Sequence, residues 1–138
     1  MASLGTGPPI PKPHPERGSL AGGQHLFATH CAGCHQIVAR GGYVTGAVPP
    51  PLGDATATQI AEAVRIGPYV MPKFSKQQIS DEELNSLVRY VQWTQHPDDR
   101  GGWAIGRIGP IPEGLVTWFF AMTVLVGGCM LIGKRLRG

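Results

Sequence analysis

An apolar run near the C-terminus constrains this chain most strongly. The run extends from Leu115 to Ile132 without a charged residue. A helix of that length spans about 27 Å at 1.5 Å per residue, close to the roughly 30 Å thickness of a bilayer core. The rest of the chain has no second soluble core that could bury such a helix. We therefore expect a transmembrane helix over residues 115–133.

The residues that flank the run indicate its orientation. Lys134, Arg135 and Arg137 follow it directly, whereas the residues before it carry charges of both signs. Lysine and arginine gather on the cytoplasmic side of membrane proteins. We therefore expect a single pass through the lipid of a plasma membrane, with the basic tail 134–138 in the cytoplasm and the preceding domain outside.

The part of the chain outside the membrane is small. Residues 19–97 look like a domain, and a domain of this size buries too little apolar surface to be very stable alone. A large apolar cofactor would supplement its core. Residues 1–18 include five prolines and are expected to form an extended arm. The Gly/Pro-rich connector 98–114, at the membrane interface, is expected to form no regular element.

Helical periodicity and capping signals predict an all-α domain. A residue that can cap a helix precedes each of three apolar, helix-periodic stretches, and two of these starts are completed as capping boxes. No stretch alternates as a strand would. Gly23 and Phe27 of the first helix are expected to cross the third helix near Tyr90. We expect three to four helices, three of them capped by Ser19, Thr56 and Ser80.

Composition argues against several classes of protein. The net charge is only +3 and aromatic residues make up 7%, so we expect no nucleic-acid partner. The three cysteines do not form an even set, and Cys129 lies in the apolar run, so we expect no disulfide framework. Residues 1–15 lack the apolar stretch of a secretory signal. Either the true start lies upstream, or the chain begins within a longer or processed polypeptide.

The strongest chemical signal is Cys31-Ala32-Gly33-Cys34-His35. The pattern C-x-x-C-H is the attachment signature of c-type haem. Two thiols one helical turn apart reach the two vinyl groups on one porphyrin edge, and the next imidazole falls under the ring centre as an iron ligand. We therefore expect one covalent haem c.

Two alternatives compete for the cysteine pair. A dithiol redox pair usually lies in a strand–helix α/β setting, which the helical patterns here do not predict. A zinc site would need a second Cys/His pair at zinc spacing, and the sequence contains none. Haem attachment is therefore the favoured reading.

Met71 is the candidate for the sixth iron ligand. It lies in a proline-bracketed segment between the second and third expected helices, whereas the other methionines are terminal or in the apolar run. Ligation by His35 and Met71 fills both axial positions and raises the reduction potential relative to two histidines. This suits electron transfer, so we expect no catalytic residues. The alternative ligands are His14, His25, His30 and His96.

Three further residues are candidate haem contacts. The second ring nitrogen of His35 needs an acceptor, and the triple-proline loop offers carbonyl groups without competing N–H groups, with Pro50 the preferred one. Arg40 and Tyr43 could reach the haem propionates, although a solvent-exposed position fits them about as well.

These motifs carry a resemblance to class I cytochrome c. More closely, residues 18–138 resemble the second haem domain and membrane tail of the dihaem cytochrome cc subunit of actinobacterial-type menaquinol–cytochrome c reductase. The distinctive feature is Gly109-Pro110-Ile111-Pro112-Glu113-Gly114 before a terminal apolar run. That family carries two C-x-x-C-H motifs and a span before the first, whereas this chain has a single motif and a single expected span, which follows the motif.

The resemblance implies an electron-transfer subunit of a quinol-oxidising respiratory or photosynthetic complex. The implied partners are cytochrome b and a Rieske iron–sulfur subunit on the donor side, and a haem–copper oxidase or another cytochrome c on the acceptor side. One alternative is a free membrane-tethered cytochrome that shuttles between complexes. The other is a haem sensor or peroxidase with a labile sixth ligand.

Overall fold

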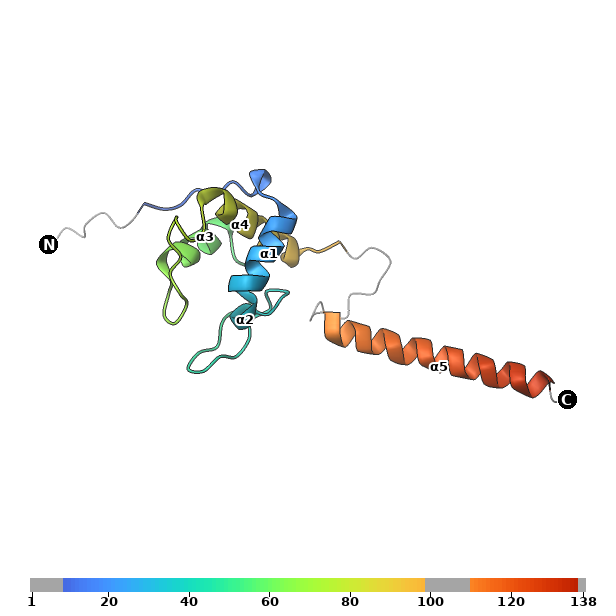
Figure 1. Ribbon diagram of the computed structural model, residues 1–138. Coiled ribbons are helices and arrows are strands. Elements are labelled where there is room, and N and C mark those ends of the chain that lie inside the picture. Colours follow the sequence, from blue (N-terminus) through green and yellow to red (C-terminus); the bar gives the residue numbers. More distant parts are fainter. Residues whose placement is uncertain (1–8, 99–109, 137–138) are drawn as a thin grey trace. The chain divides into compact units, whose positions relative to one another are not determined.

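The computed structural model describes residues 9–98 and 110–136, which belong to two separate units divided after Asp98 (Figure 1). Among these residues the β structure is limited to one isolated bridge, between Val44 and Ala47. The expected all-α class is therefore confirmed. The first unit contains, in chain order, the short 3-10 helix η1 (Pro15–Arg17) and the helices α1 (Leu20–His30), α2 (Ala32–His35), α3 (Ala57–Ile66) and α4 (Asp81–Gln95).

Local capping explains where three of these helices begin. At the start of α1 the Ser19 hydroxyl accepts a hydrogen bond from the Gly22 N–H at 3.2 Å. Capping boxes at Thr56–Gln59 and Ser80–Glu83 begin α3 and α4. Each cap satisfies backbone donors that a helix N-terminus otherwise leaves unpaired. The three starts coincide with those expected from the sequence.

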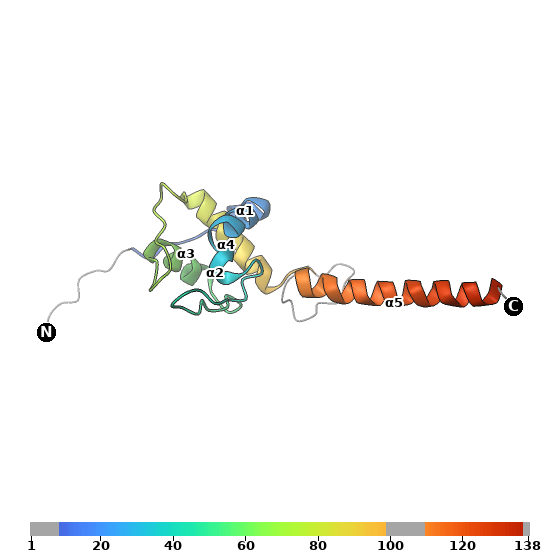
Figure 2. The same ribbon diagram turned by 60° about the horizontal axis from the view of Figure 1, so that its bottom comes forward.

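The helices α1 and α4 form the centre of the domain and lie against one another in both views (Figures 1 and 2). A Cβ at Gly23 would lie 1.9 Å from the Ser86 carbonyl oxygen, so glycine permits this close approach. Phe27 is 1% exposed and packs against Tyr90, with ring centroids 5.3 Å apart. The Tyr90 hydroxyl donates to the Ile37 carbonyl at 2.8 Å. The crossing therefore also anchors the loop that follows α2.

The proline-rich arm ends in a packed turn. Its last residues form η1, which packs against α4. The His14 N–H donates to Asn85 Oδ1 at 2.7 Å, and Arg89 donates to the Gly18 carbonyl at 2.6 Å. These contacts correct the expectation that all of residues 1–18 form an extended arm. The partners are distant in sequence, so no local pattern revealed them.

The second unit is α5 (Pro110–Leu136). Within it Gly114–Leu136 is long and apolar enough to cross a membrane, and its most apolar 18-residue window has a mean hydropathy of 2.2. The helix begins at Pro110, inside the connector expected to hold no regular element. Proline is tolerated there, because the first N–H groups of a helix have no helical partner. The remainder of the expected connector, residues 99–109, lies outside the described residues.

Candidate functional site

The helical domain contains an open cavity of about 640 Å³, a volume typical of cofactor sites. Most of its wall is apolar, and besides Cys31 the buried side chains in it are Phe27, Ile60, Val64, Phe74, Leu87 and Val91. Two separate parts of the sequence contribute the potential ligands. The fold brings to this wall all four residues that we expected to hold haem and iron, namely Cys31, Cys34, His35 and Met71.

The short helix α2 presents the C-x-x-C-H motif to the cavity. The N–H groups of Cys34 and His35 both donate to the Cys31 carbonyl oxygen, at 3.1 and 2.9 Å. A single helical turn therefore carries both thiols and the imidazole along one wall of the cavity. This is the spacing that thioether attachment requires.

The environment of Cys31 argues against a dithiol enzyme. Cys31 is only 8% exposed. Burial, and secondarily the neighbouring Cys34, raise the pKa of the Cys31 thiol to about 11. Redox-active cysteine pairs instead have a lowered thiol pKa, because the thiolate is the nucleophile. A buried thiol beside an apolar cavity suits covalent attachment of an apolar cofactor better.

The His35 imidazole has a defined orientation. Its Nδ1 lies 3.2 Å from the Pro50 carbonyl oxygen, and a carbonyl can only accept, so Nδ1 is the donor and Nε2 stays free for a metal. Gly41 lets the proline loop come this close. Its φ is +80°, and a Cβ there would lie 2.6 Å from the Pro49 carbonyl oxygen, so only glycine fits this position.

A tight loop between α3 and α4 carries Met71. The loop leaves α3 at Gly67, whose φ of 66° is left-handed. A Cβ at Gly67 would lie 2.8 Å from the Met71 carbonyl oxygen, so the chain folds back over the helix end. The Met71 N–H donates to the Pro68 carbonyl, and the Phe74 N–H donates to the Val64 carbonyl, both at 3.0 Å. Met71 is partly buried against the core.

Arg40 and Tyr43 do not line this cavity. Tyr43 is 89% exposed, next to the tight turn in which Val44 pairs with Ala47. Arg40 lines a separate hollow of about 210 Å³, together with Gln95. Their positions therefore do not support the expected contact with haem propionates, which stays a prediction.

Two further residues line the cavity: Tyr69, which was not predicted from the sequence, and His30, one of the alternative iron ligands. Tyr69 lines it and donates to the Gly46 carbonyl at 3.5 Å, which joins the two loops of the wall. His30 also lines it, with its ring packed edge-on against Phe74 at a centroid distance of 5.7 Å. Their positions in the sequence were the available signal, since Tyr69 lies two residues before Met71 and His30 directly precedes Cys31.

A helical domain that presents a C-x-x-C-H turn to an apolar cavity defines a c-type cytochrome. Residues 18–91 match the family model described as cytochrome c oxidase, cbb3-type, subunit III. The chain belongs to this family of c-type cytochromes, whose domain binds haem c.

Curated relatives extend the similarity into the C-terminal part. A cytochrome bc1 complex cytochrome c subunit of Corynebacterium diphtheriae is 38% identical over 117 residues, which are 84% of this chain and 42% of the relative. Subunits of the same name from Mycobacterium leprae and Mycobacterium tuberculosis are each 37% identical over 117 residues, covering 84% of this chain and 40% and 42% of themselves. The chain thus spans about two fifths of the length of these relatives.

The residues of the cavity fit a covalent haem. The wall is apolar, as a porphyrin requires, and one helical turn supplies both thiols. The imidazole of His35 is oriented by a carbonyl, and a thioether lines the same cavity. This donor set matches the thiol, imidazole and thioether groups that c-type haem uses.

Proposed function

We propose that this chain is a membrane-anchored mono-haem c-type cytochrome that transfers single electrons within a quinol-oxidising, cytochrome bc-type complex. The observation that carries the proposal is the meeting of Cys31, Cys34, His35 and Met71 at one apolar cavity. Relatives named as cytochrome bc1 complex subunits support the assignment to such a complex.

Each residue has a separate role in this proposal. Cys31 and Cys34 would hold the haem covalently through their thiols, and His35 and Met71 would supply an imidazole and a thioether to its iron. Pro50 holds the His35 ring in its orientation through the 3.2 Å contact. The bound haem supplies a one-electron centre. The chain itself holds no catalytic residue, and the whole complex carries out the enzymatic reaction.

The names of the relatives support a bc1 complex as the assembly, and the individual partners proposed within it are those that the family resemblance implies. Cytochrome b and a Rieske iron–sulfur subunit lie on the donor side, and a haem–copper oxidase or another cytochrome c accepts the electron. The haem domain lies outside the plasma membrane, and the basic end of α5 lies in the cytoplasm. The concentration of Lys134 and Arg135 in the last turn of α5 supports this orientation.

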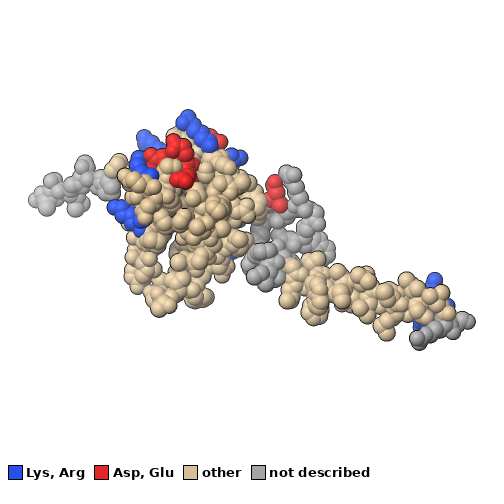
Figure 3. All heavy atoms as spheres, viewed as in Figure 1, with Lys and Arg blue, Asp and Glu red and all other residues tan. Residues whose placement is uncertain are grey.

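The cavity mouth favours a fixed subunit over a free shuttle. The loops 41–53 and 66–72 contain no charged residue. On the face seen in Figure 3, the charged side chains of the domain lie away from its lower loops. Large apolar side chains there are exposed, including Tyr69 at 88% and Val48 at 67%. Freely diffusing redox proteins commonly depend on charged surfaces that steer the encounter. Loops of this kind, apolar and without charge apart from the adjoining Asp54, suit a partner that is already close.

Purification of the tagged chain from its native membranes in mild detergent tests the proposal. We expect the denatured chain to exceed its sequence mass by one haem, and Cys31→Ser or Cys34→Ser to reduce this attachment. Cys129→Ala, a control on α5, should leave the haem spectrum unchanged. Stoichiometric recovery of a cytochrome b supports the subunit role. A chain of unmodified mass would refute the proposal.

The remaining alternatives have distinct outcomes. Recovery of the haem-loaded chain without a cytochrome b would favour the free shuttle. Strong carbon monoxide binding to the reduced protein would favour a sensor or peroxidase, since it requires a sixth ligand that leaves easily.

A further inference from the structure

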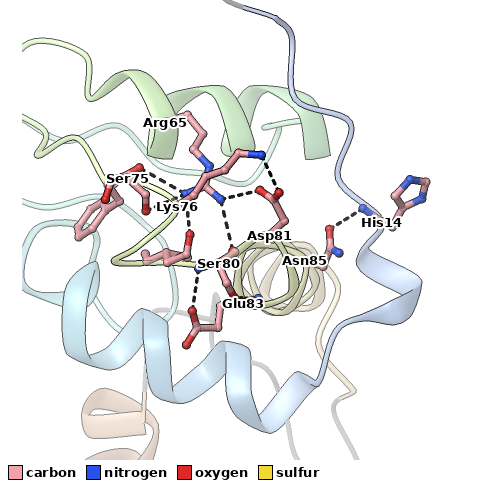
Figure 4. Close-up of polar contacts among 10 residues, drawn as sticks. His14, Arg65, Ser75, Lys76, Ser80, Asp81, Glu83 and Asn85 are labelled. Carbon is pink, nitrogen blue, oxygen red and sulfur yellow. Dashed lines mark hydrogen bonds and ion pairs between the residues drawn. The ribbon is translucent and has the colours of Figure 1, made fainter.

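A partly buried arginine holds together the segment that follows the Met71 loop. The Arg65 side chain, near the end of α3, is only 14% exposed. Its Nη1 donates to the carbonyl oxygens of Phe74 at 3.3 Å, Ser75 at 3.2 Å and Ile79 at 2.7 Å. Its Nη2 donates to the Ser80 carbonyl at 3.3 Å. One guanidinium thus contacts four backbone carbonyl oxygens (Figure 4). Those of Ser75 and Ser80 also accept hydrogen bonds from backbone N–H groups.

The Arg65 guanidinium also binds one carboxylate, that of Asp81. Asp81 Oδ1 accepts from Arg65 Nη2 at 3.0 Å, and its Oδ2 accepts from Lys76 Nζ at 2.7 Å. Figure 4 shows Arg65 and Lys76 approaching Asp81 together at the start of α4. Lys76 is exposed and, among the described contacts, bonds only to the carboxylate. The two cations therefore share an anion, and only Arg65 also binds the backbone.

These contacts lie at the base of the loop that carries Met71. The base is closed by the hydrogen bond from the Phe74 N–H to the Val64 carbonyl. Arg65, next in sequence to Val64, binds the carbonyl of the same Phe74. The loop between them makes a single internal backbone bond, from Met71 to Pro68. Its geometry therefore depends on how firmly its base is held.

From this arrangement we infer that Arg65 is a positioning residue for Met71: it clamps the base of the loop, so that the thioether is held towards the haem iron. The inference rests on the proposed role of Met71 as sixth ligand. Arginine suits the task because its planar fork presents five donors in a fixed geometry, whereas lysine offers three on a mobile ammonium. Arg65 acts only through the backbone of the loop and touches no haem ligand.

The contribution of Arg65 can be measured as the affinity with which added imidazole displaces Met71 in the oxidised, haem-loaded full chain. Arg65→Lys and Arg65→Gln should raise the apparent affinity for imidazole about tenfold, since hydrogen bonds from a charged donor are each worth that or more. The weak near-infrared sulfur-to-iron absorption should also decrease. Arg65→Lys should keep more of it than Arg65→Gln. Lys76→Gln, the matched control, should change neither quantity.

Further measurements distinguish a change in the Met71 loop from a general loss of folding. Helix content by circular dichroism identifies a temperature at which every variant is folded, and all titrations are made there. If Arg65→Gln does not fold, Asp81→Asn weakens the same clamp from its exposed side and should give an intermediate rise in imidazole affinity. Amide hydrogen exchange at Phe74 provides a readout without added ligand, and should be faster in Arg65→Lys than in Lys76→Gln.

Two results would overturn the inference. Arg65 variants that keep wild-type imidazole affinity and absorption would show that the loop holds Met71 without the clamp. A wild-type protein without the sulfur-to-iron absorption would remove the role of Met71 itself, and with it the inference. The first result leaves the proposed ligands standing and the second does not, so the two failures are distinguishable.

Discussion

His35 and Met71 reach the same cavity by different means. His35 lies on α2, next to the cysteines, and its ring is oriented by Pro50 at 3.2 Å. Met71 depends on a loop whose turn at Gly67 requires a left-handed residue. The histidine position therefore follows from adjacent residues, whereas the methionine position requires the fold.

Met71→His should lower the reduction potential by roughly 0.1–0.3 V, a part of the range of about 0.8 V that axial ligands span. The reason is that imidazole stabilises oxidised iron better than a thioether does. A redox titration of the purified protein measures the change, and Met122→Leu on α5 serves as the control. If Met71→Ala left both the spectrum and the potential unchanged, another residue would have to be the sixth ligand.

Acid should weaken the start of α4. A hydrogen bond from Lys76, and a weaker one from Arg65, lower the pKa of Asp81, and hydrogen bonds from Ser80 lower the pKa of Glu83. A carboxyl whose folded pKa is lowered contributes stability above its unfolded pKa, about 4, and loses that contribution as pH falls through the folded value.

The free energy of unfolding should therefore decrease below about pH 4. Asp81→Asn should reduce this decrease, because its side chain does not titrate. Urea unfolding followed by circular dichroism at several pH values measures both profiles. Parallel profiles for the wild type and Asp81→Asn would contradict the role of Asp81.

At the scale of elements, the crossing of α1 and α4 holds the domain together. The carbonyl of Ser86 lies where a side chain at Gly23 would be, at 1.9 Å from its Cβ. Backbone at this contact cannot rotate away as a flexible side chain can. The two helices would have to separate to admit even a methyl group.

Gly23→Ala should destabilise the haem-loaded domain by about 3 kcal/mol, the upper part of the usual range for overpacking a core. Gly53→Ala is the matched control, because no atom lies within 4 Å of a Cβ built there. Urea unfolding of both variants measures the difference. Equal stability of the two variants would mean that the helices can move apart without loss.

The helix starts were predictable because each is a local event. Ser19, Thr56 and Ser80 accept hydrogen bonds from N–H groups three residues later, and these pairs can be read from the sequence. The packing of η1 on α4 was not predictable, because His14 and Asn85 lie 71 residues apart. Nor was the early start of α5, since proline and glycine are usual in loops as well as in a first helical turn.

At the scale of the whole molecule, the membrane anchor and the uncharged loops point to the same kind of partner. A tethered cytochrome in a complex meets its partner at high effective concentration. It therefore needs no long-range electrostatic attraction. The exposed apolar residues beside the cavity, Val48, Tyr69 and Val70, are suited to short-range contact.

Electron transfer from the haem domain to its native acceptor should accordingly depend little on salt. We expect less than about a twofold change in rate between 0.01 and 0.5 M ionic strength, a range over which the Debye length falls from about 30 Å to less than 8 Å. Flash-initiated kinetics in the intact detergent-solubilised assembly measure this rate. A decrease of tenfold or more would indicate a charged docking surface and a shuttling role.

The sequence by itself determined the chemistry of attachment, the helical class and the apolar run of α5. Each of these depends on residues that are neighbours along the chain. The attachment motif is a cysteine pair followed by a histidine, each cap is a residue paired with the one three positions later, and the apolar run is a stretch without charge. Only the tertiary structure decided which residues share the cavity. It placed Arg40 and Tyr43 outside the cavity lining and His30 and Tyr69 within it, and it placed Arg65 at the base of the Met71 loop. Such contacts join residues from separate segments, whose distances are set by how α1, α3 and α4 pack and not by spacing in the sequence.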